Sequence, residues 1–290
     1  MLGKKVLSDK YVMKLYKIFE QKKWKIQESS DYSVFDRFCS RLAELENDEE
    51  RDLILELTDE FLWVQSSMYE EYLLTALKKL FKSKDWKLEK DKNIYICPLL
   101  PEKDFGKLKS STFMLYLCQS ILMRTYPEFQ DNQIRICETP EVLKQHEDRI
   151  GSLILIDDFI GSGETALECL EYLKHLITLD KKIHIVSLVA QEEGVNNINR
   201  EGISVFATQI RKKAITDVYP DSEAKEKLKA MIDISKHLHA PKGMQLGYAN
   251  TESLVAMIKT PNNTFPVYWY EHKNSYAPFV RKENVKVVRS

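Results

Sequence analysis

Helix-breaking residues are missing from the first third of the chain. All nine prolines fall at Pro98 or later, and residues 4–97 hold no glycine. Proline removes a helical hydrogen bond and glycine weakens a helix interior, so their absence permits long helices. Apolar residues there recur three and four positions apart, as in Leu73 and Leu77, which is the helical spacing. We predict four helices in this region, forming an N-terminal all-α helical domain over residues 1–90.

The sequence also lacks a long apolar run and an excess of either charge. No apolar run approaches the ~18 residues that a membrane helix requires, and charged Asp9 and Lys10 come early. The 43 Lys and Arg residues against 44 Asp and Glu residues give a formal net charge of −1. A chain-wide basic coat is therefore excluded, and we expect neither a membrane partner nor nucleic acid as a direct ligand.

Closely spaced cysteines are absent too. The five cysteines lie 19 or more residues apart and form no CxxC pair. This spacing is typical of reduced thiols, and it disfavours a metal knuckle or a secreted disulfide framework. We expect a cytoplasmic protein.

From about residue 93 the apolar period changes to short β-rich runs that alternate with helical patterns. The runs of strand type are residues 94–99, 133–137, 153–156, 183–190 and 203–207. The helical patterns lie near residues 112–122, 140–146, 165–177 and 222–238. Such alternation indicates βαβ units. We predict an α/β domain over residues 91–290, with a mainly parallel sheet flanked by helices.

One segment concentrates groups that carry chemistry. An apolar strand runs into the adjacent acids Asp157 and Asp158, and a glycine-rich turn then leads to Thr165 at the start of an amphipathic helix. Glycine lets a backbone close on an anion, and the backbone N–H groups at a helix start attract negative charge. The hydroxyls of Ser162 and Thr165 can add donors. Carboxylates repel a bare phosphate unless they face hydroxyl groups or a divalent cation, so a phosphorylated sugar suits this segment better.

The string LILIDDFIGSGETA, residues 153–166, resembles the phosphoribosyl-diphosphate (PRPP) signature of type I phosphoribosyltransferases. The positions that match are Asp157, Asp158, Ser162, Gly163 and Thr165. The resemblance implies that the two acids are catalytic and contact the ribose 2- and 3-hydroxyls. It also implies that the 5-phosphate is bound by Gly161, Ser162, Gly163, Glu164 and Thr165, and that Mg²⁺ is held through PRPP with no direct ligand from the chain.

Other interpretations of this turn remain open. Residues 161–166 also fit GxGxxA, the looser dinucleotide fingerprint, but four residues separate its first glycine from the strand and no acid ends the next strand. A Walker A loop needs Gly-Lys-Ser/Thr, and the lysine is absent. A glycine turn with a purely structural role is the third alternative.

A phosphoribosyltransferase also needs a loop for diphosphate, and residues 98–111 occupy the expected place. Lys107, Lys109, Ser110 and Ser111 stand where a helix begins and could hold diphosphate there. Lysines beside acidic residues are equally typical of an ordinary solvated loop. Both interpretations stay open, and loss of the diphosphate loop would leave a sugar-phosphate sensor.

The C-terminal part supplies a second resemblance. Gly247-Tyr248, an apolar strand, TPNNT and a late Trp269 are similar to the end of bacterial phosphoribosyltransferase-like proteins associated with genetic-conflict and anti-phage loci. Asn262 and Asn263 could read the edge of an acceptor base, or could simply form an Asx turn after proline. His237 and His239 lack a third ligand at useful spacing, so we do not expect a metal site there.

Together the two resemblances imply transfer of a 5-phosphoribosyl group from PRPP, with Mg²⁺, to a small-molecule nitrogen acceptor in anti-phage defence. The alternative is a non-catalytic sensor of PRPP or a nucleotide that regulates a protein partner through the N-terminal helical domain. Fold alone does not separate an enzyme from a sensor.

Overall fold

The computed structural model describes residues 6–26, 33–84, 86, 92–125, 127, 134–178, 182–273 and 275–281. Contacts between residues divide the chain into two compact units. The first unit comprises the described parts of residues 1–64 and 212–288, and the second comprises those of residues 65–211.

A five-stranded parallel sheet forms the centre of the second unit. Its strand order is β3-β2-β4-β5-β6, and every neighbouring pair is parallel. The strands are β2 (Asn93–Pro98), β3 (Ile134–Ile136), β4 (Ile150–Ile160), β5 (Lys182–Gln191) and β6 (Ser204–Arg211). The predicted mainly parallel sheet is confirmed, and the five predicted strands all form.

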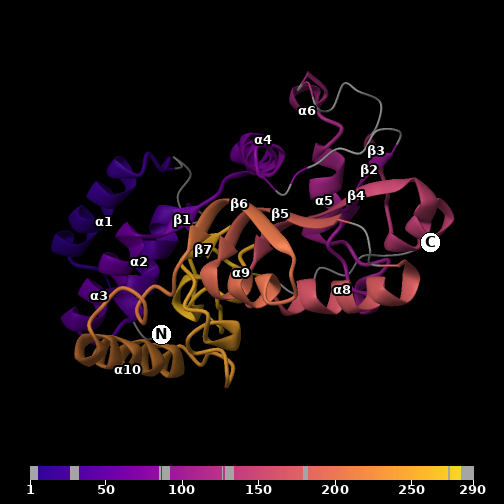
Figure 1. The fold of residues 1–290 in the computed structure, drawn as a ribbon. Helices are drawn as coiled ribbons and strands as arrows, with labels where there is room; N and C mark the ends of the chain where they lie inside the picture. Colours follow the sequence, from indigo (N-terminus) through magenta and orange to yellow (C-terminus); the bar gives the residue numbers. More distant parts are fainter. Residues whose placement is uncertain are drawn as a thin grey trace. The chain divides into compact units, whose positions relative to one another are not determined.

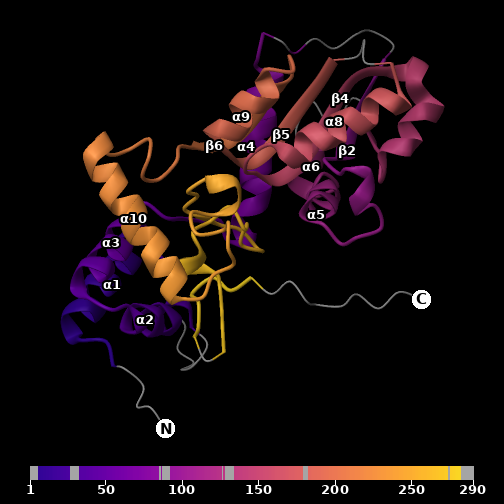
Figure 2. The ribbon, with the colours of Figure 1, turned by 90° about the horizontal axis from the view of Figure 1, so that it is seen from below.

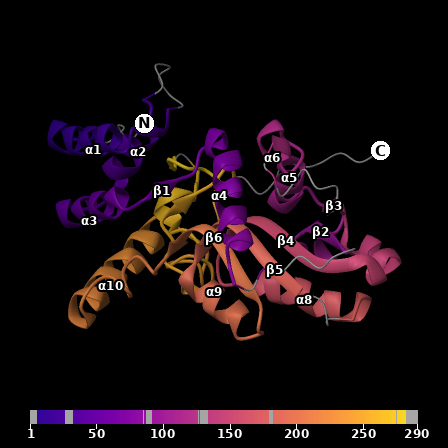
Figure 3. The same cartoon turned by 45° about the horizontal axis from the view of Figure 1, so that its top comes forward.

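Helices cover both faces of this sheet (Figure 1). The helices of the unit are α4 (Tyr69–Phe81), α5 (Ser110–Leu117), α6 (Ile121–Thr125), α8 (Glu164–Leu176) and α9 (Glu192–Asn199), with 3-10 turns η2 (Ser66–Met68), η3 (Glu102–Asp104) and η4 (Pro140–Arg149). Helices α4 and α5 lie on one face and α8 and α9 on the other, as Figures 1 and 3 show. Coverage on both faces explains why β4 and β5 read as nearly continuous apolar runs.

The first unit is mainly helical. Its elements are α1 (Asp9–Gln21), α2 (Val34–Glu44), α3 (Asp48–Asp59), α10 (Asp221–His237), the short parallel pair β1 (Leu62–Trp63) and β7 (Val255–Ala256), and the turns η5 (Tyr248–Asn250) and η6 (Pro266–Tyr268). Aromatic rings fill its core, and the rings of Phe61 and Phe279 stack with centroids 4.9 Å apart. Figure 2 shows α10 and the three N-terminal helices from below.

The four predicted N-terminal helices are all present as α1 to α4. The contacts nevertheless divide the chain at residues 64 and 211, whereas the sequence analysis places one boundary at residue 90. The difference arises because α4 packs against β5 and β6, and because α10 packs against α3. An amphipathic period shows that a helix has a buried face, but it does not show which surface that face covers.

No helix among the described residues is long and apolar enough to cross a membrane.

All five cysteines are free thiols, four of them buried.

Candidate active site

Strand β4 delivers two acids to the carboxyl end of the sheet. It lies between β2 and β5, and Asp157 is in register with Ser187 of β5. Asp158 is 6% exposed, and Asp157 is partly exposed. In open parallel sheets, ligands bind beyond the carboxyl ends of the strands. The two acids therefore stand at the edge where this fold class places its chemistry.

Hydroxyl and amide groups hold both carboxylates. Ser110 Oγ donates to Asp157 Oδ1 at 2.7 Å, and the Asp158 amide donates to the same oxygen at 2.8 Å. Tyr69 Oη donates to Asp158 Oδ2 at 2.9 Å. Within the part of the chain that the structure describes, neither acid belongs to an ion pair. Their oxygens thus retain capacity for further donors, because a carboxylate offers about four acceptor positions.

The protein environment disfavours charge on both acids. Burial raises the pKa of Asp157 well above its ordinary value, and the neighbouring Asp158 charge raises it further. Burial also raises the pKa of Asp158, while the hydroxyls of Ser110 and Tyr69 favour its charged form. Two close and largely desolvated carboxylates titrate as a pair and hold protons more tightly than exposed acids do. Such a pair can both accept hydrogen bonds from the hydroxyls of an incoming polyol and, where a proton is retained, donate to them.

A glycine turn connects β4 to α8. Gly163 adopts a left-handed conformation with φ of +89°, and α8 begins at the next residue, Glu164. The N-cap residue Gly163 has no side chain to offer, the Glu164 amide makes only a long hydrogen bond of 3.5 Å to Ser162 Oγ, and Glu164 and Thr165 are exposed. The first backbone N–H groups of a helix need partners from outside the helix, and the helix dipole favours an anion there. The turn therefore has the backbone geometry of a phosphate site.

Helix α9 packs against the glycine turn and stabilises it. A Cβ atom added at Gly194 would lie 2.2 Å from the Gly161 carbonyl oxygen, and Asn197 Nδ2 donates to the Ser162 carbonyl at 3.0 Å. The sequence analysis missed this helix and both supporting residues. A signal was present, because two acids open the segment and Val195 and Ile198 keep helical spacing.

The loop over residues 98–111 reaches the acids through Ser110. Lys107 and Lys109 both pair with Asp104, each with a nitrogen to oxygen distance of 2.8 Å. Burial alone would raise the pKa of Asp104, but hydrogen bonds from the two lysines bring it below its ordinary value. Ser111 is 1% exposed and lies in the first turn of α5. The loop thus brings one predicted diphosphate residue, Ser110, beside the acid pair, and holds two others, Lys107 and Lys109, in ion pairs with the mostly buried Asp104.

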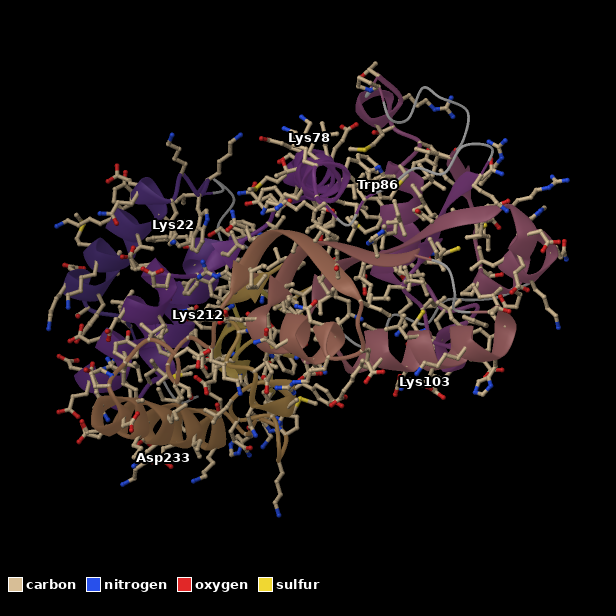
Figure 4. All side chains as sticks on the ribbon, in the orientation of Figure 1. Lys22, Lys78, Trp86, Lys103, Lys212 and Asp233 are labelled. Atoms are coloured by element: carbon tan, nitrogen blue, oxygen red, sulfur yellow. The ribbon has the colours of Figure 1, made fainter. Side chains whose placement is uncertain are left out.

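Lys103, another lysine of this loop, pairs with α8. Its Nζ lies 2.6 Å from Glu168 Oε1, and Figure 4 labels it next to that helix. Both side chains are substantially exposed, and exposed pairs of this kind contribute little to stability. Lys103 can therefore exchange its partner at small energetic cost.

Asn262 and Asn263 lie in the first unit. The carbonyl oxygen of Asn263 accepts from the Ser253 amide at 3.2 Å, and the Tyr248 amide donates to the Asn262 carbonyl at 2.8 Å. A Cβ atom at Gly247 would lie 1.9 Å from the Asn263 carbonyl oxygen, which explains the glycine in this segment. These backbone contacts give the pair a structural role; its proposed acceptor role remains a prediction.

The two C-terminal histidines of α10 contact other groups. His237 Nδ1 lies 3.1 Å from Glu46 Oε1, and the rings of His239 and His272 are 5.1 Å apart. They line a cavity of about 480 Å³ in the first unit. Over the described ranges, no group of three or more His, Cys, Asp or Glu side chains is arranged to hold a metal ion.

The parallel sheet, together with the segment of residues 157–165 that contains the two acids and the glycine turn (the acid–glycine segment), defines a phosphoribosyltransferase-like protein. A model of the PRTase-CE family matches residues 38–282. Because this match spans most of the sequence, the chain belongs to the PRTase-CE family.

Two solved structures are also similar to this chain. The Helicobacter pylori xanthine-guanine-hypoxanthine phosphoribosyltransferase is 11% identical, with 52% of this chain and 84% of that chain covered and a TM-score of 0.30. The orotate phosphoribosyltransferase from Aeropyrum pernix is 13% identical, with 50% and 72% covered and a TM-score of 0.28. A search of curated proteins found no match.

Proposed function

We propose that this protein binds PRPP together with Mg²⁺ and transfers the 5-phosphoribosyl group to a nitrogen acceptor, a base or a nucleotide-related compound. The observation that carries the proposal is the acid pair of Asp157 and Asp158, held by hydroxyl and amide donors and followed directly by a glycine turn that opens α8. Paired carboxylates suit ribose hydroxyls, and a helix start preceded by a glycine turn suits a phosphate monoester. Membership of the PRTase-CE family supports the same assignment.

The proposed roles follow from the charge that develops during transfer. The bond from the anomeric carbon to diphosphate breaks, the new bond to the acceptor nitrogen forms, and the ring passes through a cationic state. Asp157 and Asp158 hold the ring hydroxyls and stabilise that positive charge. Mg²⁺ enters with PRPP as part of the substrate and supplies charge neutralisation for the leaving diphosphate. The residues proposed for the 5-phosphate are Gly161, Ser162, Gly163, Glu164 and Thr165.

Diphosphate is proposed to bind at the start of α5. The first N–H groups of that helix, at Ser110 and Ser111, face outward from its N-terminus, and Lys109 precedes it. Lys107 and Lys109, whose own side chains are 53% and 39% exposed, are proposed to move from the mostly buried Asp104 to the more highly charged diphosphate. Asn262 and Asn263 remain the proposed acceptor-side residues.

Calorimetry with PRPP and Mg²⁺ tests the proposal. The wild-type protein is expected to bind, and the double variant Asp157→Asn with Asp158→Asn is expected to show no measurable binding. Asparagine preserves shape but removes the charge that favours the ring hydroxyls and the developing cation. Asp233→Asn, an exposed substitution on α10, serves as the matched control and should bind as the wild type does. Equal PRPP affinity in the double variant would refute the assignment.

A non-catalytic sensor is the second candidate, and the lysine pairs of the 98–111 loop favour it. Both Lys107 and Lys109 contact Asp104, so the loop as it stands presents them to an acid of its own. Release of diphosphate from PRPP and Mg²⁺, measured across a panel of purine, pyrimidine and nicotinamide-type bases, separates the candidates. Turnover on any base supports the transferase. Binding without turnover on every base supports the sensor.

The proposal includes a cellular setting. We place the reaction in the cytoplasm, where free thiols such as the five found here persist. We propose a role in bacterial anti-phage defence, with the N-terminal helical domain as the surface for a protein partner. Nucleotide profiling of infected cells with and without the protein tests this role, and an unaltered nucleotide pool would contradict it.

A further inference from the structure

Tyr69 contacts the acid pair from a distant part of the sequence. It is the first residue of α4, is 1% exposed, and donates through its hydroxyl to Asp158, 89 residues further along the chain. Its ring packs edge-on against Phe113 of α5, with centroids 5.9 Å apart. The hydroxyl is therefore delivered by a side chain whose ring is itself fixed by packing.

Helix α4 gives this donor a rigid support. Lys79 Nζ donates to the Ala207 carbonyl of β6 at 2.7 Å, and the Thr208 hydroxyl of β6 donates to the Tyr72 carbonyl. These bonds connect the helix to a strand of the same sheet that carries the acids. Groups on packed helices and strands are held more closely in place than groups on loops.

An aspartate carboxylate needs a fixed hydrogen-bond donor to hold its orientation, because its χ2 torsion has a broad, roughly two-fold distribution. Asp157 is fixed at Oδ1 by Ser110 and by the Asp158 amide. Asp158 is fixed at Oδ2 by Tyr69. The dependence is mutual, since a buried phenol without an acceptor and a buried carboxylate without a donor are both costly.

Resting on the proposed function, we infer that Tyr69 is a positioning residue of the ribose site, which holds the Asp158 carboxylate in the orientation that receives a ring hydroxyl. Tyr69 acts through Asp158 and does not itself touch the phosphate. Its removal should therefore weaken ligands that carry the ring and leave a ligand that occupies only the glycine turn unaffected. A purely structural role predicts equal losses for both kinds of ligand.

Two probes distinguish these roles: ribose 5-phosphate, measured by calorimetry, and inorganic phosphate, measured by NMR titration. Tyr69→Phe keeps the ring that packs on Phe113 and removes only the hydroxyl. We expect affinity for ribose 5-phosphate to fall about tenfold, as loss of one hydrogen bond to a charged group does, with phosphate affinity unchanged. Tyr72→Phe removes a hydroxyl from the same helix and should leave both affinities as in the wild type.

Three results would overturn the inference: an unchanged affinity of Tyr69→Phe for ribose 5-phosphate, an equal loss for both probes, or the same loss in Tyr72→Phe. Thermal unfolding of each variant shows whether a loss reflects partial unfolding, which would lower both affinities together. If the wild-type protein binds neither PRPP nor ribose 5-phosphate, the proposed function fails and the inference fails with it. Binding by the wild type with no selective loss in Tyr69→Phe refutes the inference alone.

Discussion

Replacing Gly194 by alanine is expected to weaken binding of ribose 5-phosphate about 100-fold, which corresponds to about 3 kcal/mol of hydrogen bonding to the charged phosphate. An added Cβ would lie 2.2 Å from the Gly161 carbonyl oxygen and 3.0 Å from the Ile160 side chain. Real Cβ atoms do not approach a carbonyl so closely, so the turn or α9 must move. The turn carries the backbone N–H groups proposed for the phosphate, and any such movement misaligns them.

The direction of this effect opposes helix propensity, which makes the prediction specific. Alanine in a helix interior is favoured over glycine by about 1 kcal/mol where nothing else intervenes. Asn196→Ala, at an exposed position of the same helix, gains propensity without approaching the turn and is the matched control. It should bind ribose 5-phosphate as the wild type does. Equal affinity in Gly194→Ala, measured by calorimetry, would show that the turn does not depend on its contact with α9.

The acid–glycine segment could be predicted from the sequence because its chemistry is contiguous. Two acids, a glycine turn and a helix start follow one another within residues 157–165, so the strand and the helix bring them together without help from the rest of the chain. The glycine at position 163 is also explained locally, since its φ of +89° disfavours any residue with a side chain. Local pattern and local geometry agree here.

The support of the site could not be predicted in this way. Tyr69 is 89 residues from Asp158, and a tyrosine in an apolar helical stripe looks like any other core residue. Gly194 looks like a helix breaker, although it lies inside α9 because a larger residue has no room beside Gly161. Both roles follow from tertiary contacts, and a single sequence does not state which elements meet.

The unit to which α4 belongs also depends on tertiary contacts that a single sequence does not state. Its apolar spacing resembles that of the three helices before it, so the sequence favours one helical domain over residues 1–90. Its contacts are with β5 and β6, and they place it in the unit that carries the acids. The tyrosine that contacts Asp158 therefore comes from a helix that the sequence analysis placed outside the α/β domain.

Asp157→Asn is expected to stabilise the protein while it weakens ribose 5-phosphate binding. Burial and the Asp158 charge raise the pKa of Asp157 well above its ordinary value of 3.8. A raised pKa means that the folded state disfavours the ionised carboxylate relative to the unfolded chain, which lowers stability at pH values above the ordinary pKa. Asparagine removes the charge and keeps an oxygen that accepts from Ser110 and the Asp158 amide. We expect the free energy of unfolding at pH 7 to rise.

The stabilising effect of Asp157→Asn should depend on pH. Because the folded state holds the Asp157 proton more tightly than the unfolded chain does, the contribution of Asp157 to wild-type stability falls as pH rises from 3.8 through the raised pKa. The stability difference between Asp157→Asn and wild type should accordingly be smallest below pH 3.8 and largest above the raised pKa. Urea unfolding across this range measures it, with exposed Asp233→Asn on α10, labelled in Figure 4, expected to stay within about 0.5 kcal/mol of wild type at every pH. An acid kept for structure alone would destabilise the fold when replaced, so a gain in stability joined to a loss of ligand affinity marks Asp157 as a residue that serves binding at the expense of the fold.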